Sequence, residues 1–113
     1  MTIIETMENI IESINSIKDS ILKFVPARYI YLYGSYAYGE PTAESDIDIF
    51  VITPDDGKRI LDLIVEIRLD LVKKNMFFID LLVSTESDFN DRKDKYLLEK
   101  TILQKGKLIY ECA

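Results

Sequence analysis

A glycine-serine pair that ends one apolar run, followed by two aspartates that open the next, constrains this chain more than any other feature. The first run, residues 29–33, reads YIYLY and stops at Gly34 and Ser35. Ten residues later, Asp46 and Asp48 flank an isoleucine at the start of the second run. The β-branched and aromatic composition of both runs predicts strands. The sequence therefore predicts a tight turn at the exit of one strand and two carboxylates at the entrance of the next.

Asp46 and Asp48 are two positions apart, with one residue between them, so in a strand they face the same side. Their Cα atoms would be about 6.6 Å apart, at a rise of roughly 3.3 Å per residue. Two like charges so placed repel each other, and a bound cation would relieve that repulsion. The chain has no histidine and one cysteine, so the ligands would be oxygens, which favours Mg²⁺ or Mn²⁺ over Zn²⁺. By itself, an Asp-x-Asp is more often the polar face of an edge strand.

Gly34 and Ser35 provide a second kind of chemistry. A glycine lets the backbone approach a ligand closely, and a serine offers a hydroxyl and an amide to an anion. Alone, such a pair is usually only a turn. Next to a cation site, it suits the phosphates of a nucleoside triphosphate.

Asp80 interrupts a third apolar run, residues 76–83, which reads MFFIDLLV and predicts a buried strand. A carboxylate inside an apolar strand costs free energy unless a cation or hydrogen bonds compensate it. The competing interpretation places Asp80 at a sheet edge or beside a lysine or arginine.

The Gly-Ser-x10-Asp-x-Asp pattern resembles the signature of the nucleotidyltransferase superfamily related to DNA polymerase β. The short chain is similar to the minimal nucleotidyltransferases (MNT), partners of HEPN toxins in prokaryotic toxin-antitoxin pairs. This resemblance implies an α+β fold in two layers, with helices packed on a small mixed sheet. It also implies nucleotide binding at Gly34 and Ser35, and a catalytic, metal-binding triad of Asp46, Asp48 and Asp80.

The resemblance further implies a reaction and a partner. ATP would be the substrate, Mg²⁺ or Mn²⁺ the metal, and a tyrosine of a cognate HEPN RNase toxin the acceptor of AMP. The chain departs from the family pattern at Tyr38, where many members carry arginine, and a tyrosine cannot replace that charge.

Length and charge exclude several other classes. The 113 residues with a net charge of −6 predict one domain, without the basic face that a sequence-independent nucleic-acid binder needs. We expect no signal peptide and no membrane span. Cys112 is the one cysteine, so no internal disulfide is expected and the cytoplasm is the predicted compartment.

The predicted domain comprises an N-terminal helix (1–24), a catalytic core (28–83) and a C-terminal helix with a short strand (84–113). An isoleucine-rich stripe predicts that the first helix packs on the sheet, or docks a partner helix in a hetero-oligomer. The second strand is expected over 45–53, and a helix from 53–56 to residue 74, with Asp55 and Asp56 near its N-terminus. A polar connection (84–88), a helix ending near Gly106 and a strand over 107–111 complete the prediction. The stripe residues are Ile3, Met7, Ile10, Ile14, Ile17 and Ile21, widened by Ile4 and Ile11.

Two functions compete with a toxin-modifying enzyme. The first is a non-catalytic binding module that inhibits its partner by complex formation, which Tyr38 favours. The second is the catalytic subunit of a small-molecule nucleotidyltransferase that works with a helper chain. A P-loop enzyme is excluded because the chain has no Gly-Lys-Ser/Thr.

Overall fold

The computed structural model describes residues 3–42 and 44–112, which form five helices and a four-stranded sheet. The sheet order is β3-β2-β1-β4; β2 and β3 are parallel, and the other two pairs are antiparallel. The predicted α+β class with a mixed sheet is therefore confirmed. The elements are α1 (Ile3–Phe24), β1 (Tyr29–Tyr33), α2 (Ser35–Tyr38), β2 (Ile47–Thr53), α3 (Ile60–Lys73), β3 (Ile79–Thr85), α4 (Glu86–Arg92), α5 (Leu97–Lys105) and β4 (Lys107–Glu111).

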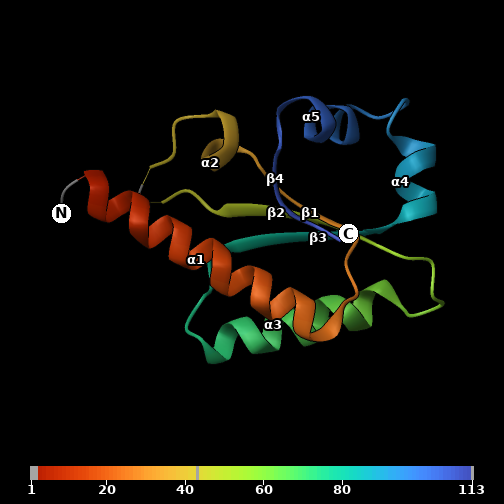
Figure 1. Cartoon of the computed structure of the whole chain (residues 1–113), viewed down its shortest axis with the longest axis horizontal. Helices are drawn as coiled ribbons and strands as arrows, with labels where there is room; N and C mark the ends of the chain where they lie inside the picture. Colours follow the sequence, from red (N-terminus) through yellow and green to blue (C-terminus); the bar gives the residue numbers. More distant parts are fainter. Residues whose placement is uncertain (1–2, 43, 113) are drawn as a thin grey trace.

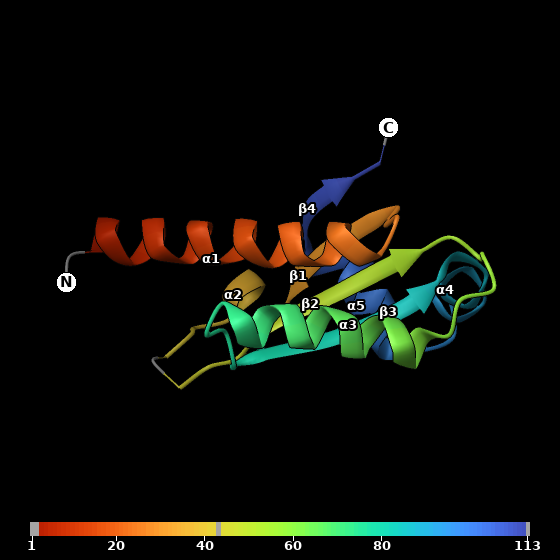
Figure 2. The same cartoon turned by 90° about the horizontal axis from the view of Figure 1, so that it is seen from below.

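Helices cover both faces of the sheet (Figure 1). α1 and α3 lie side by side across one face, while α2, α4 and α5 lie on the other. Figure 2 shows that the N-terminal part of α1 extends beyond the sheet. The larger core forms under α1 and α3, and a smaller cluster, rich in aromatic residues, forms under α4 and α5.

The alternation of β1 assigns its side chains to these two cores. Ile30 and Leu32 are buried in the larger core, whereas Tyr29, Tyr31 and Tyr33 belong to the aromatic cluster. Successive strand residues point to opposite faces, so one strand serves both layers. The side chains at the start of the predicted α1 stripe, those of Ile3, Ile4 and Met7, lie outside the described part.

A buried polar contact joins α1 to α3. Asp70 accepts a hydrogen bond from the Ser20 hydroxyl at 2.7 Å and forms an ion pair with Lys23 at 2.9 Å. Lys74 approaches the same carboxylate at 3.9 Å. The Asp70 side chain faces the neighbouring helix instead of solvent, so polar groups fix how the two helices pack.

The predicted start of the second long helix is wrong. α3 begins at Ile60, and residues 54–59 form an extended loop in which Gly57 has a φ of 81°. Asp55 does not cap α3; its carboxylate accepts hydrogen bonds from the amide and hydroxyl of Ser87. A contact between distant parts of the chain thus replaces the local cap that the sequence predicted.

The prediction of a strand over 76–83 is confirmed from Ile79 on, but its start and its expected burial are wrong. β3 is an edge strand that begins at Ile79, and Phe77 and Phe78 before it are exposed. After β3, Thr85 caps α4 by accepting a hydrogen bond from the Asp88 amide, so 84–88 is not an irregular connection. Among the helices of the described residues, none has the length and apolarity needed to cross a bilayer.

Candidate functional site

Gly34 connects β1 to the short helix α2 and has a positive φ of 69°. Its carbonyl oxygen accepts hydrogen bonds from the amides of Ala37 at 3.0 Å and Tyr38 at 3.1 Å. Glycine adopts this backbone conformation without steric cost. Ser35 is the first residue of α2, and Tyr36 and Tyr38 belong to the same short helix.

Asp48 packs directly against this turn. A Cβ built on Gly34 would be 2.0 Å from Asp48 Oδ2, so any larger residue at position 34 would collide with the carboxylate. The glycine predicted to admit a ligand therefore also makes room for one of the predicted metal ligands.

Strand register places Asp80 beside Asp48. The two are partners in the parallel β2-β3 pair, and Tyr33 is the partner of Asp48 in the antiparallel β1-β2 pair. Neighbouring strands are about 4.8 Å apart, so Tyr33, Asp48 and Asp80 form a row across the sheet, on the face that carries α4 and α5. We call these three residues, two carboxylates and the tyrosine beside them, the carboxylate row.

Asp80 is exposed at the sheet edge, so the expected burial of this carboxylate is wrong. The strand register nevertheless places it next to Asp48. Asp46 precedes β2 instead of lying in it, and it is also exposed. Its loop is held by the Thr42 amide, which donates to the Ser45 hydroxyl at 2.8 Å.

The electrostatics of the carboxylate row indicate uncompensated negative charge. Burial, and then the charges of Asp80 and Asp46, raise the pKa of Asp48. Burial, and then the negative charges of Asp80 and Asp48, raise the pKa of the Tyr33 hydroxyl. No ion pair within residues 3–42 and 44–112 includes Asp46, Asp48 or Asp80. No lysine or arginine of this part of the chain therefore neutralises them.

The donor set fits a hard divalent cation because all three candidate ligands are carboxylates. No three His, Cys, Asp or Glu side chains of the described ranges are already grouped closely enough to hold a metal ion. Asp48 is partly buried and lies against Gly34, whereas Asp46 and Asp80 are exposed. Completing such a site therefore requires the two exposed side chains to turn toward Asp48.

A hollow of about 330 Å³ lies farther along β2 and β3, at the edge of the sheet. Phe50 and Leu82, two residues beyond Asp48 and Asp80, form part of its lining, together with Arg92 from α4. None of the candidate site residues lines it.

Lys105 is the site neighbour that the sequence did not single out. Its Nζ lies 6.0 Å from the centre of the Tyr38 ring, which brings a positive charge from the end of α5 to α2. Only the packing of α5 near α2 distinguishes Lys105 from the other basic residues of this segment.

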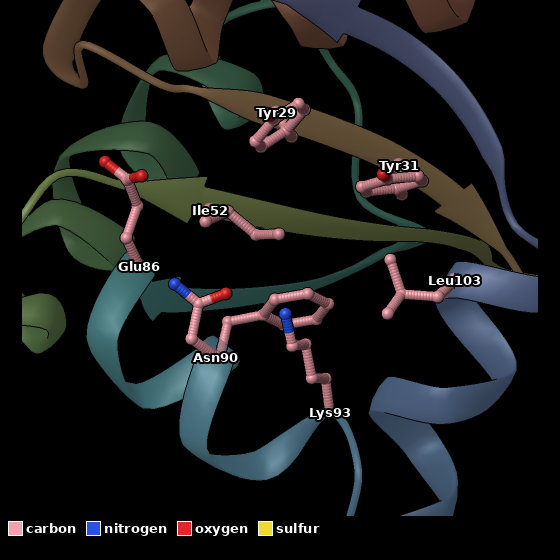
Figure 3. A pocket seen from close by; sticks show the side chains of 8 residues that line it. Tyr29, Tyr31, Ile52, Glu86, Asn90, Lys93 and Leu103 are labelled. Atoms are coloured by element: carbon pink, nitrogen blue, oxygen red, sulfur yellow. The ribbon is translucent and has the colours of Figure 1, made fainter.

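A separate cavity of about 230 Å³ lies at the other end of β1 (Figure 3). Tyr29 and Tyr31 form one wall, and Asn90 of α4 and Lys93, which directly follows α4, face them. Tyr29 is four residues from Tyr33, about 13 Å along the strand, and none of the candidate site residues lines this cavity.

Comparisons with known proteins agree with this geometry. The family model described as "Polymerase beta, Nucleotidyltransferase" matches residues 15–112. A candidate protein adenylyltransferase of Methanocaldococcus jannaschii is 35% identical over 81 residues, which cover 72% of this chain and 76% of that protein.

Two solved structures share the fold. A candidate nucleotidyltransferase from Sulfolobus solfataricus superposes with a TM-score of 0.66 at 19% identity, covering 96% of this chain and 86% of the other. A toxin-antitoxin structure with AMP-PNP gives a TM-score of 0.62 at 22% identity, covering 87% of this chain and 73% of the other. With the family match across most of its length, the chain belongs to the polymerase β-like nucleotidyltransferase family and is a nucleotidyltransferase.

Proposed function

We propose that this protein transfers AMP from ATP to a tyrosine of a cognate HEPN-type toxin in a magnesium-dependent reaction, and so acts as the antitoxin of a cytoplasmic pair. The name of the M. jannaschii relative supports protein adenylylation. The toxin-antitoxin structure with AMP-PNP supports both a nucleotide and a toxin partner. The observation that carries the proposal is the register pairing of Asp48 with Asp80 next to Gly34.

The metal and the nucleotide are assigned to different residues. Asp46, Asp48 and Asp80 would hold Mg²⁺, or Mn²⁺ in its place, and the ion would offset the negative charge of the triphosphate. The Gly34 backbone and the Ser35 hydroxyl would contact the terminal phosphates. This division agrees with the raised pKa of Asp48, which reflects burial first and then the charges of Asp80 and Asp46.

The proposed transfer forms one bond and breaks one. The acceptor hydroxyl oxygen bonds to the α-phosphorus of ATP, the bond from that phosphorus to the bridging oxygen breaks, and pyrophosphate leaves. Asp80 accepts the hydroxyl proton, because a carboxylate within hydrogen-bond reach of the hydroxyl can act as a general base. Its position on an exposed edge strand leaves it accessible to a tyrosine of another protein.

Incubation with Mg²⁺, labelled ATP and the product of the neighbouring gene tests the proposal. Label is expected on a tyrosine of that product, located by mass spectrometry, and it should be lost with Asp46→Asn or Asp48→Asn. Asp94→Asn is the matched control, since Asp94 is an exposed carboxylate in the turn between α4 and α5 and belongs to none of the candidate site positions. Label on a small molecule would instead favour the helper-chain enzyme.

Tyr38 supports a second candidate, a non-catalytic antitoxin that inhibits its toxin by occlusion. The missing arginine removes a charge next to the proposed phosphate site, and Tyr38 itself is exposed. Tight complex formation without label under any condition would favour this function over the enzyme.

A further inference from the structure

We propose that two copies of this chain associate through the outer face of α3, with the two helices antiparallel about a two-fold axis. This inference is independent of the proposed function. It rests on the exposed side chains of α3 and on the charges beside them.

α3 is apolar on two sides. Its inner side buries Leu63, Ile67 and Leu71 against the sheet. Its outer side presents four further branched apolar residues, which we call the outer stripe. They are Leu61 at 65% exposure, Val65 at 55%, Leu69 at 59% and Val72 at 49%.

The outer stripe is continuous instead of scattered. Its members follow one another at intervals of four, four and three residues, which is the spacing of one helix face. From Leu61 to Val72 the stripe is about 17 Å long, at a rise of roughly 1.5 Å per residue. Single exposed apolar residues are common, but a contiguous apolar strip on a helix indicates an interaction surface.

The charges along the stripe indicate what covers it. Asp62 lies at the N-terminal end of α3 and Lys73 at the C-terminal end, on the same flank of the stripe at a helical repeat of about 100° per residue. Both are exposed, and neither takes part in an ion pair of the described residues. An acid at one end and a base at the other complement the same helix running in the opposite direction.

The positions of the apolar and charged pairs agree on one axis. Leu61 and Val72 are eleven residues apart, and so are Asp62 and Lys73. A two-fold axis through the middle of α3, near position 67, places each residue opposite the other member of its pair in the second copy. The midpoint of the apolar pair and the midpoint of the charged pair differ by one residue, or about 1.5 Å along the helix, so one axis serves both pairs closely. Isologous contacts of this kind close into a dimer and do not propagate.

Two further charges lie near the axis. Glu66 is exposed on the flank of Asp62 and Lys73 and is turned farther from the outer stripe than either of them, at about 100° per residue. Arg68 lies on the other flank, where an unpaired charge near the axis would repel its copy. Its guanidinium instead donates a hydrogen bond to the Ile79 carbonyl oxygen at 3.2 Å, which directs it toward β3. The carboxylate row lies on the opposite face of the sheet from α3 (Figure 1). Pairing through α3 therefore leaves both sites accessible.

Sedimentation of the full chain over a concentration series up to about 1 mM, at low ionic strength, measures this association; a single pair of helices is a small interface and calls for high concentrations. A monomer-dimer equilibrium is expected. Leu69→Asp should abolish the dimer, and circular dichroism checks that the variant is folded. Ile11→Asp, an equally exposed apolar site on α1, is the matched control and should still dimerise.

A charge exchange tests the antiparallel arrangement. Asp62→Lys and Lys73→Asp should each raise the dimer Kd about tenfold, because each opposes like charges twice across the axis. Mixing the two variants should restore association, since every pair in the mixed dimer is then attractive. The double variant Asp62→Lys/Lys73→Asp should dimerise like the original chain.

Three results would overturn the inference. One is a monomer at every concentration. Another is a dimer that folded Leu69→Asp leaves intact. The third is a monomer whose complex with another protein is lost in Leu69→Asp, which would assign the outer stripe to a different partner.

Discussion

The carboxylate of Asp48 occupies the space that a side chain at Gly34 would need, with Oδ2 only 2.0 Å from the position of a Cβ there. The turn that ends β1 and the acid that opens β2 are therefore mutually dependent. A change at the glycine acts directly on the carboxylate row, even though the two residues are fourteen positions apart in the sequence.

Gly34→Ala is expected to destabilise the protein and to reduce nucleotide transfer strongly. The Gly34 backbone, with φ 69° and ψ −154°, lies in a region that is almost restricted to glycine and costs about 1–3 kcal/mol for a residue with a Cβ, and displacement of Asp48 adds to that cost. Gly57→Ala is the matched control, because Gly57 also has a positive φ but a Cβ there meets nothing within 4 Å. Urea unfolding and transfer assays on both variants make the comparison. Equal loss of stability and intact transfer in Gly34→Ala would contradict the proposed contact.

The contact of Asp70 with α1 predicts a pH-dependent stability. Hydrogen bonds from Lys23 and Ser20, with the charges of Lys23 and Lys74, lower the pKa of Asp70 below its ordinary value of 3.8. A lowered pKa in the folded state stabilises the fold above the ordinary value, and this contribution is lost as the pH falls through the lowered one.

Asp70→Asn should therefore be less stable than the original chain near neutral pH, and the difference should shrink below about pH 4. Thermal unfolding between pH 2 and pH 7, with the exposed Asp94→Asn as control, measures it; these limits span the range over which carboxylates titrate. A stability difference that does not change across this range would show that the ion pair is not its source.

How much of this arrangement could be predicted depends on whether its causes are local. Gly34, the alternation of β1 and the strand nature of 47–53 follow from nearby residues, and the structure contains all three. The start of α3 does not, because Asp55 binds Ser87, thirty-two positions away. The sequence of 53–56 alone still looks like a helix N-terminus.

Asp80 shows the same limit within the candidate site. Its carboxylate was expected to be buried, and the family resemblance implied that it lies near Asp48, but strand order makes β3 an edge strand and leaves Asp80 exposed. Strand order is a tertiary property that the composition of residues 76–83 does not reveal. The proximity of the two carboxylates comes from parallel register.

Tyr38→Arg is expected to strengthen nucleotide binding. The substitution adds a charge to α2, next to Gly34, and one charge-assisted hydrogen bond to phosphate is worth about 1.5–3 kcal/mol. A roughly tenfold lower Kd for ATP corresponds to the low end of that range. Tyr38→Gln, which adds length without charge, should give no such gain. If both variants bind ATP equally, the charge at position 38 has no role here.

The most direct test of the central claim is calorimetric titration of ATP into the original chain, Asp48→Asn and Asp80→Asn, each with and without Mg²⁺. If the two carboxylates hold a metal-nucleotide complex, both variants lose binding in the presence of Mg²⁺. Without the metal, they should bind ATP at least as well as the original chain, because one repulsive charge has been removed. Binding with Mg²⁺ that is unchanged in both variants would contradict the account.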